Sequence, residues 1–133
     1  MKNILVIILF FYFQICFSQI KKLNIDSIAN YILTQKQINS SNLNPNQEEA
    51  YYMAYKKMSP SEQFERLLEI SKYLKFKKNY KKSIKVLNFA SKHNSNPSPK
   101  INKIYLLKAA NFNALGLYDS VSFYLDKLKT FVS

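Results

Sequence analysis

Two short breaks, Lys78-Asn79-Tyr80 and Gly116-Leu117-Tyr118, interrupt the second half of the chain. Each break separates two amphipathic segments, and its tyrosine opens the second of them. Apolar residues on both sides of each break recur every three or four positions, which places them on one face of a helix. The stretch 64–131 therefore predicts two successive helical hairpins, of which the second repeats the first.

Two further helices are expected before these hairpins, over residues 23–39 and about 46–58. We expect Asn44 to cap the second of them, with Pro45 at its first position. Its predicted inward face consists of Tyr51, Ala54, Tyr55 and Met58. The sequence leaves open whether the pair 23–58 is a degenerate hairpin or an N-terminal cap. In all, the pattern predicts six helices and no strand.

The two hairpins are expected over residues 60–93 and 99–132. Each begins with a serine and a proline, Ser59-Pro60 and Ser98-Pro99, a combination typical of a helix start. Gly116 stands where a helix end needs a left-handed residue, a conformation that glycine adopts without strain. The residues predicted to face inward are Phe64, Leu67, Leu68, Ser71, Leu74, Tyr80, Ser83, Ile84, Leu87, Ala90, Ile101, Ile104, Tyr105, Ala109, Phe112, Tyr118, Val121, Leu125, Leu128 and Val132.

The segment 1–18 has the pattern of a secretory signal peptide. A lysine at position 2 precedes an apolar run from Ile4 to Phe13, and the small residue Ser18 follows it. We expect cleavage after Ser18 and an exported domain, 19–133, in the periplasm or outside the cell. The alternative is an uncleaved apolar segment that anchors the chain in a membrane.

The chain is strongly basic, with 20 lysines and arginines against 8 acidic residues and a formal charge of +12. Only Arg66 is an arginine, whereas nucleic-acid surfaces usually use the planar guanidinium group. We therefore expect no nucleic-acid partner, all the more so for an exported protein. Two alternative explanations of the lysine excess are codon bias and a functional anionic partner. A basic ridge is predicted on one face of the helix after Tyr80, at Lys81, Lys85 and Lys92.

No combination of residues suggests catalysis. His93 is the only histidine, and the single cysteine lies inside the predicted signal peptide. The acidic residues occupy first helical turns or ordinary surface pairs, so none forms a general acid–base dyad. We predict no catalytic residue, no metal site and no cofactor, and hence not an enzyme.

The order of helix, tight break, tyrosine, helix and terminal break resembles the tetratricopeptide repeat family, whose unit has about 34 residues. The matching positions are Leu67, Ile70, Ser71, Leu74, Tyr80, Ser83, Leu87 and Ala90 in the first unit. In the second unit they are Tyr105, Ala109, Phe112, Gly116, Tyr118 and Leu125. The chain departs from the family where Asn79-Tyr80 lacks the glycine, where Lys108 replaces a leucine and where Val121 replaces a small residue. Its two units are also 38 residues apart, as Tyr80 and Tyr118 show, instead of about 34.

This resemblance implies an all-α fold of antiparallel hairpins stacked as a short α-solenoid. It also implies that the first helix of each hairpin lines a concave groove that binds an extended peptide. By position, the groove residues are Glu65, Leu68, Lys72, Lys75, Phe76, Lys103, Leu106, Ala110 and Asn113. The three lysines suit a carboxylate, although a plainly solvated surface is the alternative interpretation.

We therefore expect a non-enzymatic scaffold that binds a protein or peptide. Exported arrays of this kind often form the sensor portion of membrane-tethered bacterial regulators. The alternatives are a cationic binder of anionic lipid or polyanion at the cell envelope, and a remnant of a longer regulator. Because repeat arrays need about three units and a polar cap, the last helix is also expected to self-associate or to have once continued into further repeats. The edge residues are Tyr124, Leu128 and Phe131.

Overall fold

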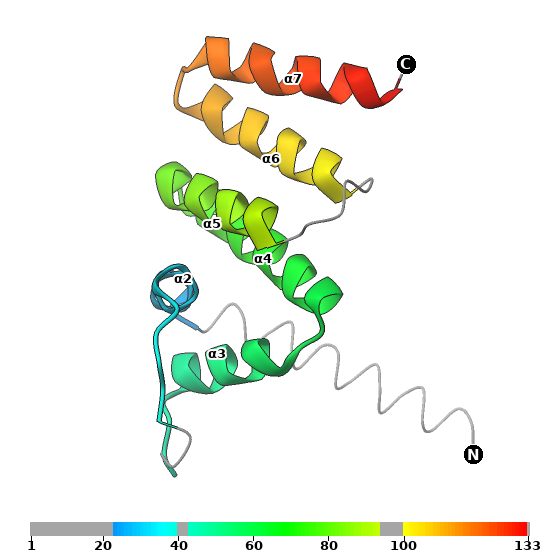
Figure 1. Ribbon diagram of the computed structural model, residues 1–133. Coiled ribbons are helices and arrows are strands. Elements are labelled where there is room, and N and C mark those ends of the chain that lie inside the picture. The colour runs from blue at the N-terminus through cyan, green and yellow to red at the C-terminus, as the bar shows by residue number, and fades with distance from the viewer. Residues whose placement is uncertain (1–22, 40–42, 94–99, 133) are drawn as a thin grey trace, which may run out of the picture.

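The computed structural model describes residues 23–39, 43–93 and 100–132 (Figure 1). Within these ranges the elements are α2 (Ile25–Thr34), α3 (Gln47–Lys57), α4 (Pro60–Phe76), α5 (Tyr80–His93), α6 (Lys100–Ala114) and α7 (Tyr118–Val132). The prediction of an all-α chain with six helices is thus confirmed. The segment predicted as a signal peptide lies outside the described residues. Of the helices described, none has the length and apolar character needed to span a bilayer.

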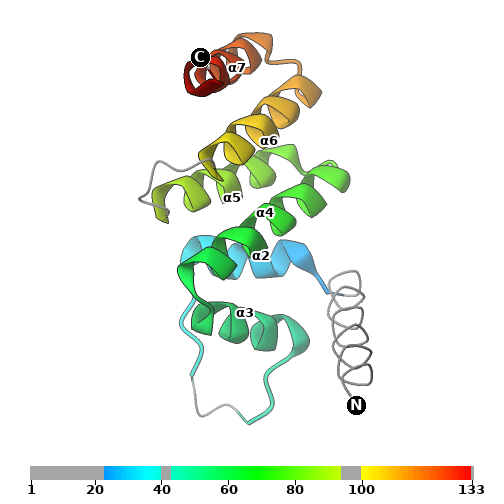
Figure 2. The ribbon, with the colours of Figure 1, turned by 90° about the vertical axis from the view of Figure 1, so that its right-hand side faces the viewer.

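The helices from α4 to α7 lie side by side in chain order, as two antiparallel hairpins (Figures 1 and 2). The hairpins meet through α5 and α6, and α4 also contacts α6. The N-terminal pair packs differently: α2 contacts both helices of the first hairpin, while α3 contacts α2 and α4. Helix α2 therefore covers one end of the core between α4 and α5.

Both breaks between paired helices have the same backbone geometry. Lys78 and Gly116 are left-handed, with φ angles of 64° and 76°. In each break the next amide donates to a carbonyl five positions back, at 2.8 Å and 2.9 Å. The predicted role of Gly116 is confirmed, and Lys78 takes the equivalent conformation although it carries a Cβ atom. The predicted start of α4 is also confirmed, because the Ser59 side chain accepts a hydrogen bond from the Glu62 amide at 3.3 Å.

The bounds of the first two helices differ from prediction. Helix α2 ends at Thr34 rather than at 39, because Gln35 is left-handed and its amide turns back to the carbonyl of Ile32. Helix α3 begins after Asn46, whose side chain accepts a hydrogen bond from the Glu49 amide at 2.7 Å. The predicted cap at Asn44 is therefore wrong, since the cap is Asn46, and Pro45 lies before the helix.

The inward face of α3 is rotated relative to the prediction. Tyr52 and Tyr55 are buried, whereas Ala54 is exposed. Tyr52 packs against Tyr31 of α2, with ring centroids 5.9 Å apart. Contact with α2 selects this face, and the spacing of apolar residues within α3 did not reveal it.

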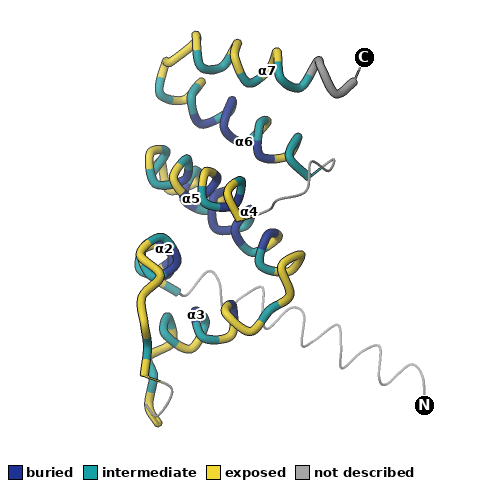
Figure 3. The backbone as a smooth tube through the Cα atoms, viewed as in Figure 1, coloured by how far each residue is buried: buried dark blue, intermediate teal, exposed yellow. Residues whose placement is uncertain are grey.

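The core lies between α2, α3, α4, α5 and α6 (Figure 3). All five residues predicted to face inward from α4 are buried. In α5, Tyr80 and Ile84 are only half-buried, and Val86 is buried instead. In α6, Ile104 and Ala109 are buried as predicted, and the polar residues Lys108 and Asn111 join them.

Helix α7 is the least covered of the six in the part of the chain that the structure describes. Tyr118 and Leu125, both predicted to face inward, are exposed. Tyr124 packs instead against α6, with its ring stacked on Phe112 at 5.6 Å. Helix α6 is the main neighbour of α7, so apolar side chains outside that contact remain in solvent.

A short polar chain crosses the core where α4, α5 and α6 meet. The Ser83 hydroxyl donates to the backbone carbonyl of Ser71 at 2.7 Å and accepts from the Asn111 amide group at 3.0 Å. Asn111 also donates to the carbonyl of Leu107 at 2.9 Å. Its Oδ1 atom has no hydrogen-bond partner among the described residues. These bonds join the two hairpins, and one buried acceptor is left over.

The left-handed lysine leads to a first prediction. A left-handed residue with a Cβ atom costs about 1–2 kcal/mol relative to glycine, and the greater freedom of glycine in the unfolded chain offsets part of this. Lys78→Gly should therefore stabilise the fold by about 0.5–1 kcal/mol in urea unfolding followed by circular dichroism. The control, Lys77→Gly, sits at φ −80° and should destabilise it. Equal losses from both variants would contradict the assigned backbone strain.

The polar chain leads to a second prediction. Ser83→Ala removes a buried donor and the acceptor of Asn111, and should destabilise the fold by about 1–3 kcal/mol. Asn111→Leu keeps the number and branching of side-chain atoms and removes the unpaired oxygen. It should change the free energy of unfolding by less than about 1 kcal/mol. A larger loss from Asn111→Leu than from Ser83→Ala would show that the oxygen is paired in solution.

Candidate functional site

The predicted peptide-binding residues lie on α4 and α6, which are neighbours in the structure. The two helices contribute positions that are equivalent in the two hairpins, such as Glu65 and Lys103. At this pair, Glu65 Oε1 lies 3.9 Å from Lys103 Nζ and links the two helices across the surface. The two helices that carry the predicted set are thus neighbours and are linked at one surface pair. We call the surface formed by the members of the set that reach solvent the α4/α6 face.

The α4/α6 face is largely polar and open to solvent. Phe76 is 78% exposed and Leu106 is 54% exposed, so both offer apolar contact area. Lys72 and Asn113 are exposed, while Lys75 and Ala110 are half-buried. Three lysines and one glutamate give this face a positive balance.

Leu68 is the predicted groove residue that the structure does not place on the surface. It is 2% exposed and belongs to the hydrophobic core, whereas its equivalent Leu106 is exposed. The difference follows from position in the stack: α4 contacts α2, α3, α5 and α6, and these neighbours cover more of its circumference.

The predicted basic ridge is exposed along α5. Lys81, Lys85 and Lys92 are all solvent-exposed, and α5 itself contains no acidic residue. Lys82 lies off this ridge and forms an ion pair with Asp26 of α2. Asn79 donates to the same carboxylate at 3.2 Å. Sequence reasoning missed this polar contact, because no local pattern relates positions so distant in the chain.

The predicted self-association edge of α7 is only partly available. Tyr124 is packed against α6, Leu128 is half-buried and the side chain of Phe131 lies outside the described residues. Phe123 and Leu125 are the apolar side chains of α7 that reach solvent near them.

A buried lysine lies beneath this edge. The amine of Lys108 is 5.1 Å from the centre of the Tyr124 ring. Burial, and to a lesser degree the charge of Lys127, lower the pKa of Lys108. The aliphatic part of the Lys108 side chain is buried, and its amine lies over the ring of Tyr124.

The tyrosines of α3 form a cluster that the sequence pattern did not single out. Tyr52 and Tyr55 stack at 6.4 Å, and Tyr31 of α2 joins them. Burial raises the pKa of Tyr55 to about 12 and also raises that of Tyr52. Burial likewise raises the pKa of Tyr51 to about 12, against the charge of Arg66. In the sequence, only the repetition of tyrosine at positions 51, 52 and 55 could have indicated this cluster.

In residues 23–39, 43–93 and 100–132, no three His, Cys, Asp or Glu side chains come together in a way that could hold a metal ion. Comparisons of the chain with models of protein families, with curated proteins and with solved structures give no match.

The buried tyrosines lead to a third prediction. Because Tyr55 is buried protonated, the native state binds more protons than the unfolded state between pH 10 and 12, and stability falls as the pH rises through this window. Tyr55→Phe should reduce this fall by up to about 1 kcal/mol per pH unit, after allowance for solvent screening. Urea unfolding at several alkaline pH values measures it.

The matched control is Tyr118→Phe, which removes a hydroxyl from an exposed ring. It should leave the alkaline slope unchanged. A slope that is the same in wild type and Tyr55→Phe would show that the hydroxyl of Tyr55 is hydrated in the native state.

Proposed function

We propose that this chain is a helical-repeat scaffold, similar to tetratricopeptide repeats, that binds an extended peptide along the α4/α6 face. The observation that carries the proposal is the shared geometry of the two hairpins. Both breaks have a left-handed residue and the same backfolded amide. Stacked hairpins present their first helices side by side, and α4 and α6 are neighbours here.

The chemistry of the α4/α6 face suits a peptide with acidic groups. Lys72, Lys75 and Lys103 supply positive charge, and Phe76 and Leu106 supply exposed apolar area. The ion pair between Lys103 and Glu65 has a long separation of 3.9 Å between well-exposed side chains. Such a pair contributes little stability, so exchanging Glu65 for a ligand carboxylate has a small energetic cost.

The place of action that we propose is outside the cytoplasm. The support is the signal-like sequence of the segment 1–18: an early lysine, a short apolar run and Ser18. In that setting the partner is a protein or peptide of the cell envelope, and the chain serves as a sensor or adaptor rather than as an enzyme.

A second candidate function is favoured by the exposed ridge on α5. Lys81, Lys85 and Lys92 face solvent, and no acidic side chain lies on the same helix. This arrangement suits an anionic lipid surface or a polyanion.

Two variants with the same loss of charge separate the first two functions, and this is our fourth prediction. One replaces Lys72, Lys75 and Lys103 by glutamine, and the other replaces Lys81, Lys85 and Lys92. The full-length chain is immobilised and incubated with cell-envelope extract. If it is a peptide-binding scaffold, the first variant should lose a captured protein that the second variant retains.

The cationic-binder function predicts a different result. The chain should capture anionic vesicles, this capture should fall steeply with salt, and only the variant at Lys81, Lys85 and Lys92 should lose it. Equal losses in both variants point to unspecific charge and contradict the scaffold proposal. Melting curves of both variants are the control, because the substituted lysines lie at the surface and the fold should be unaffected.

A further inference from the structure

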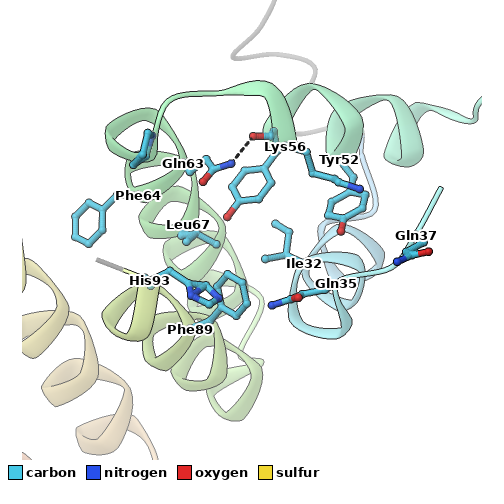
Figure 4. A pocket seen from close by; sticks show the side chains of 13 residues that line it. Ile32, Gln35, Gln37, Tyr52, Lys56, Gln63, Phe64, Leu67, Phe89 and His93 are labelled. Atoms are coloured by element: carbon cyan, nitrogen blue, oxygen red, sulfur yellow. Dashed lines mark hydrogen bonds between the residues drawn. The ribbon is translucent and has the colours of Figure 1, made fainter. Parts of the chain in front are cut away.

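A cleft of about 380 Å³ lies between the N-terminal helix pair and the first hairpin (Figure 4). Helix α2, the segment after it and α3 line one side, and the first half of α4 and the end of α5 line the other. Small-ligand sites typically measure about 300–1,000 Å³, so the cleft suits a compact molecule. It shares no lining residue with the α4/α6 face or with the ridge on α5.

The walls of the cleft are mainly apolar. Phe64 and Leu67 of α4 lie on one side, and Ile32 of α2 lies across from Leu67 (Figure 4). Phe89 closes one end beside His93, with the two rings edge to face at 4.0 Å. These surfaces can exclude water from the body of a ligand that carries a ring or a branched chain.

The polar groups of the cleft include several donors, and no aspartate or glutamate lines it. Lys56 Nζ lies 5.1 Å from the centre of the Tyr52 ring. Within the described ranges no carboxylate forms an ion pair with Lys56. The Gln63 side chain is held in place, because its Nε2 donates to the carbonyl of Tyr55 at 3.0 Å.

The tyrosines supply a second, independent observation. Tyr52 and Tyr55 line the cleft, and within the described residues neither hydroxyl is engaged in a hydrogen bond or fully shielded from solvent. A phenol is protonated at neutral pH, so each hydroxyl can donate a hydrogen bond to a ligand in the cleft.

We propose that this cleft binds a small organic anion with an apolar, ring-sized body. The anionic oxygens accept hydrogen bonds from Lys56 and the tyrosine hydroxyls, and the body contacts Phe64, Leu67 and Phe89. A cation is disfavoured because no carboxylate lines the cleft and the whole chain carries a charge of +12. The small molecule would thus bind at a site separate from the α4/α6 face, which we propose binds a peptide.

The test compares two probes of the same shape, 3-phenylpropionate and its neutral amide, on the full-length chain with ¹³C-labelled isoleucine and leucine methyl groups. We expect the carboxylate to shift the methyl signals of Ile32 and Leu67 saturably, and the amide to bind about tenfold more weakly. Lys56→Gln should weaken the carboxylate about five- to tenfold.

Lys57→Gln is the matched control, since Lys57 is the next lysine, is exposed and does not line the cleft. It should leave carboxylate binding unchanged, as should glutamine at Lys72, Lys75 and Lys103. Tyr52→Phe gives a second test that does not alter charge, and should weaken binding severalfold. Equal binding of acid and amide, equal effects at Lys56 and Lys57, or no shift of these methyls at about 10 mM probe would overturn the proposal.

Discussion

Two small residues, Ser71 of α4 and Ser83 of α5, lie where these helices meet. The Ser83 hydroxyl donates a hydrogen bond to the backbone carbonyl of Ser71 at 2.7 Å. Asn111 extends this bond to α6. The chain of bonds links α4, α5 and α6, the helices whose arrangement forms the α4/α6 face. A buried polar chain of this kind is directional, whereas apolar packing alone tolerates several alternative arrangements.

Much of the fold could be predicted because its signals are local. The serine and proline before α4, the glycine after α6 and the apolar period of α4 each specify structure over a short stretch of chain. The inward faces of α3 and α7 could not be predicted in this way. Tyr52 faces inward because α2 lies against it, and Leu125 faces solvent because its side of α7 is uncovered.

The candidate sites also differ in how far local sequence determines them. The α4/α6 face follows from a repeat period that can be read in the chain, and Glu65 and Lys103 do meet. Leu68 was misplaced because burial depends on how many neighbours a helix has, which the period does not record. The cleft beside Tyr52 and Lys56 was invisible to sequence reasoning, since segments distant in sequence supply its walls.

Left-handed residues end three helices in the described part of the chain, and two of them, Gln35 and Lys78, are not glycine. A chain with a single glycine thus relies on residues that do not favour this conformation locally. Contacts between helices must hold these ends in place: α2 packs across α4 and α5, and α6 packs against both. The turn of the first hairpin is closed by its own backbone, since the Asn79 amide donates to the carbonyl of Leu74 at 2.8 Å. Packing against α2 and α6 offsets the cost of the left-handed Lys78, so the hairpins are expected to fold as one cooperative body rather than one after another.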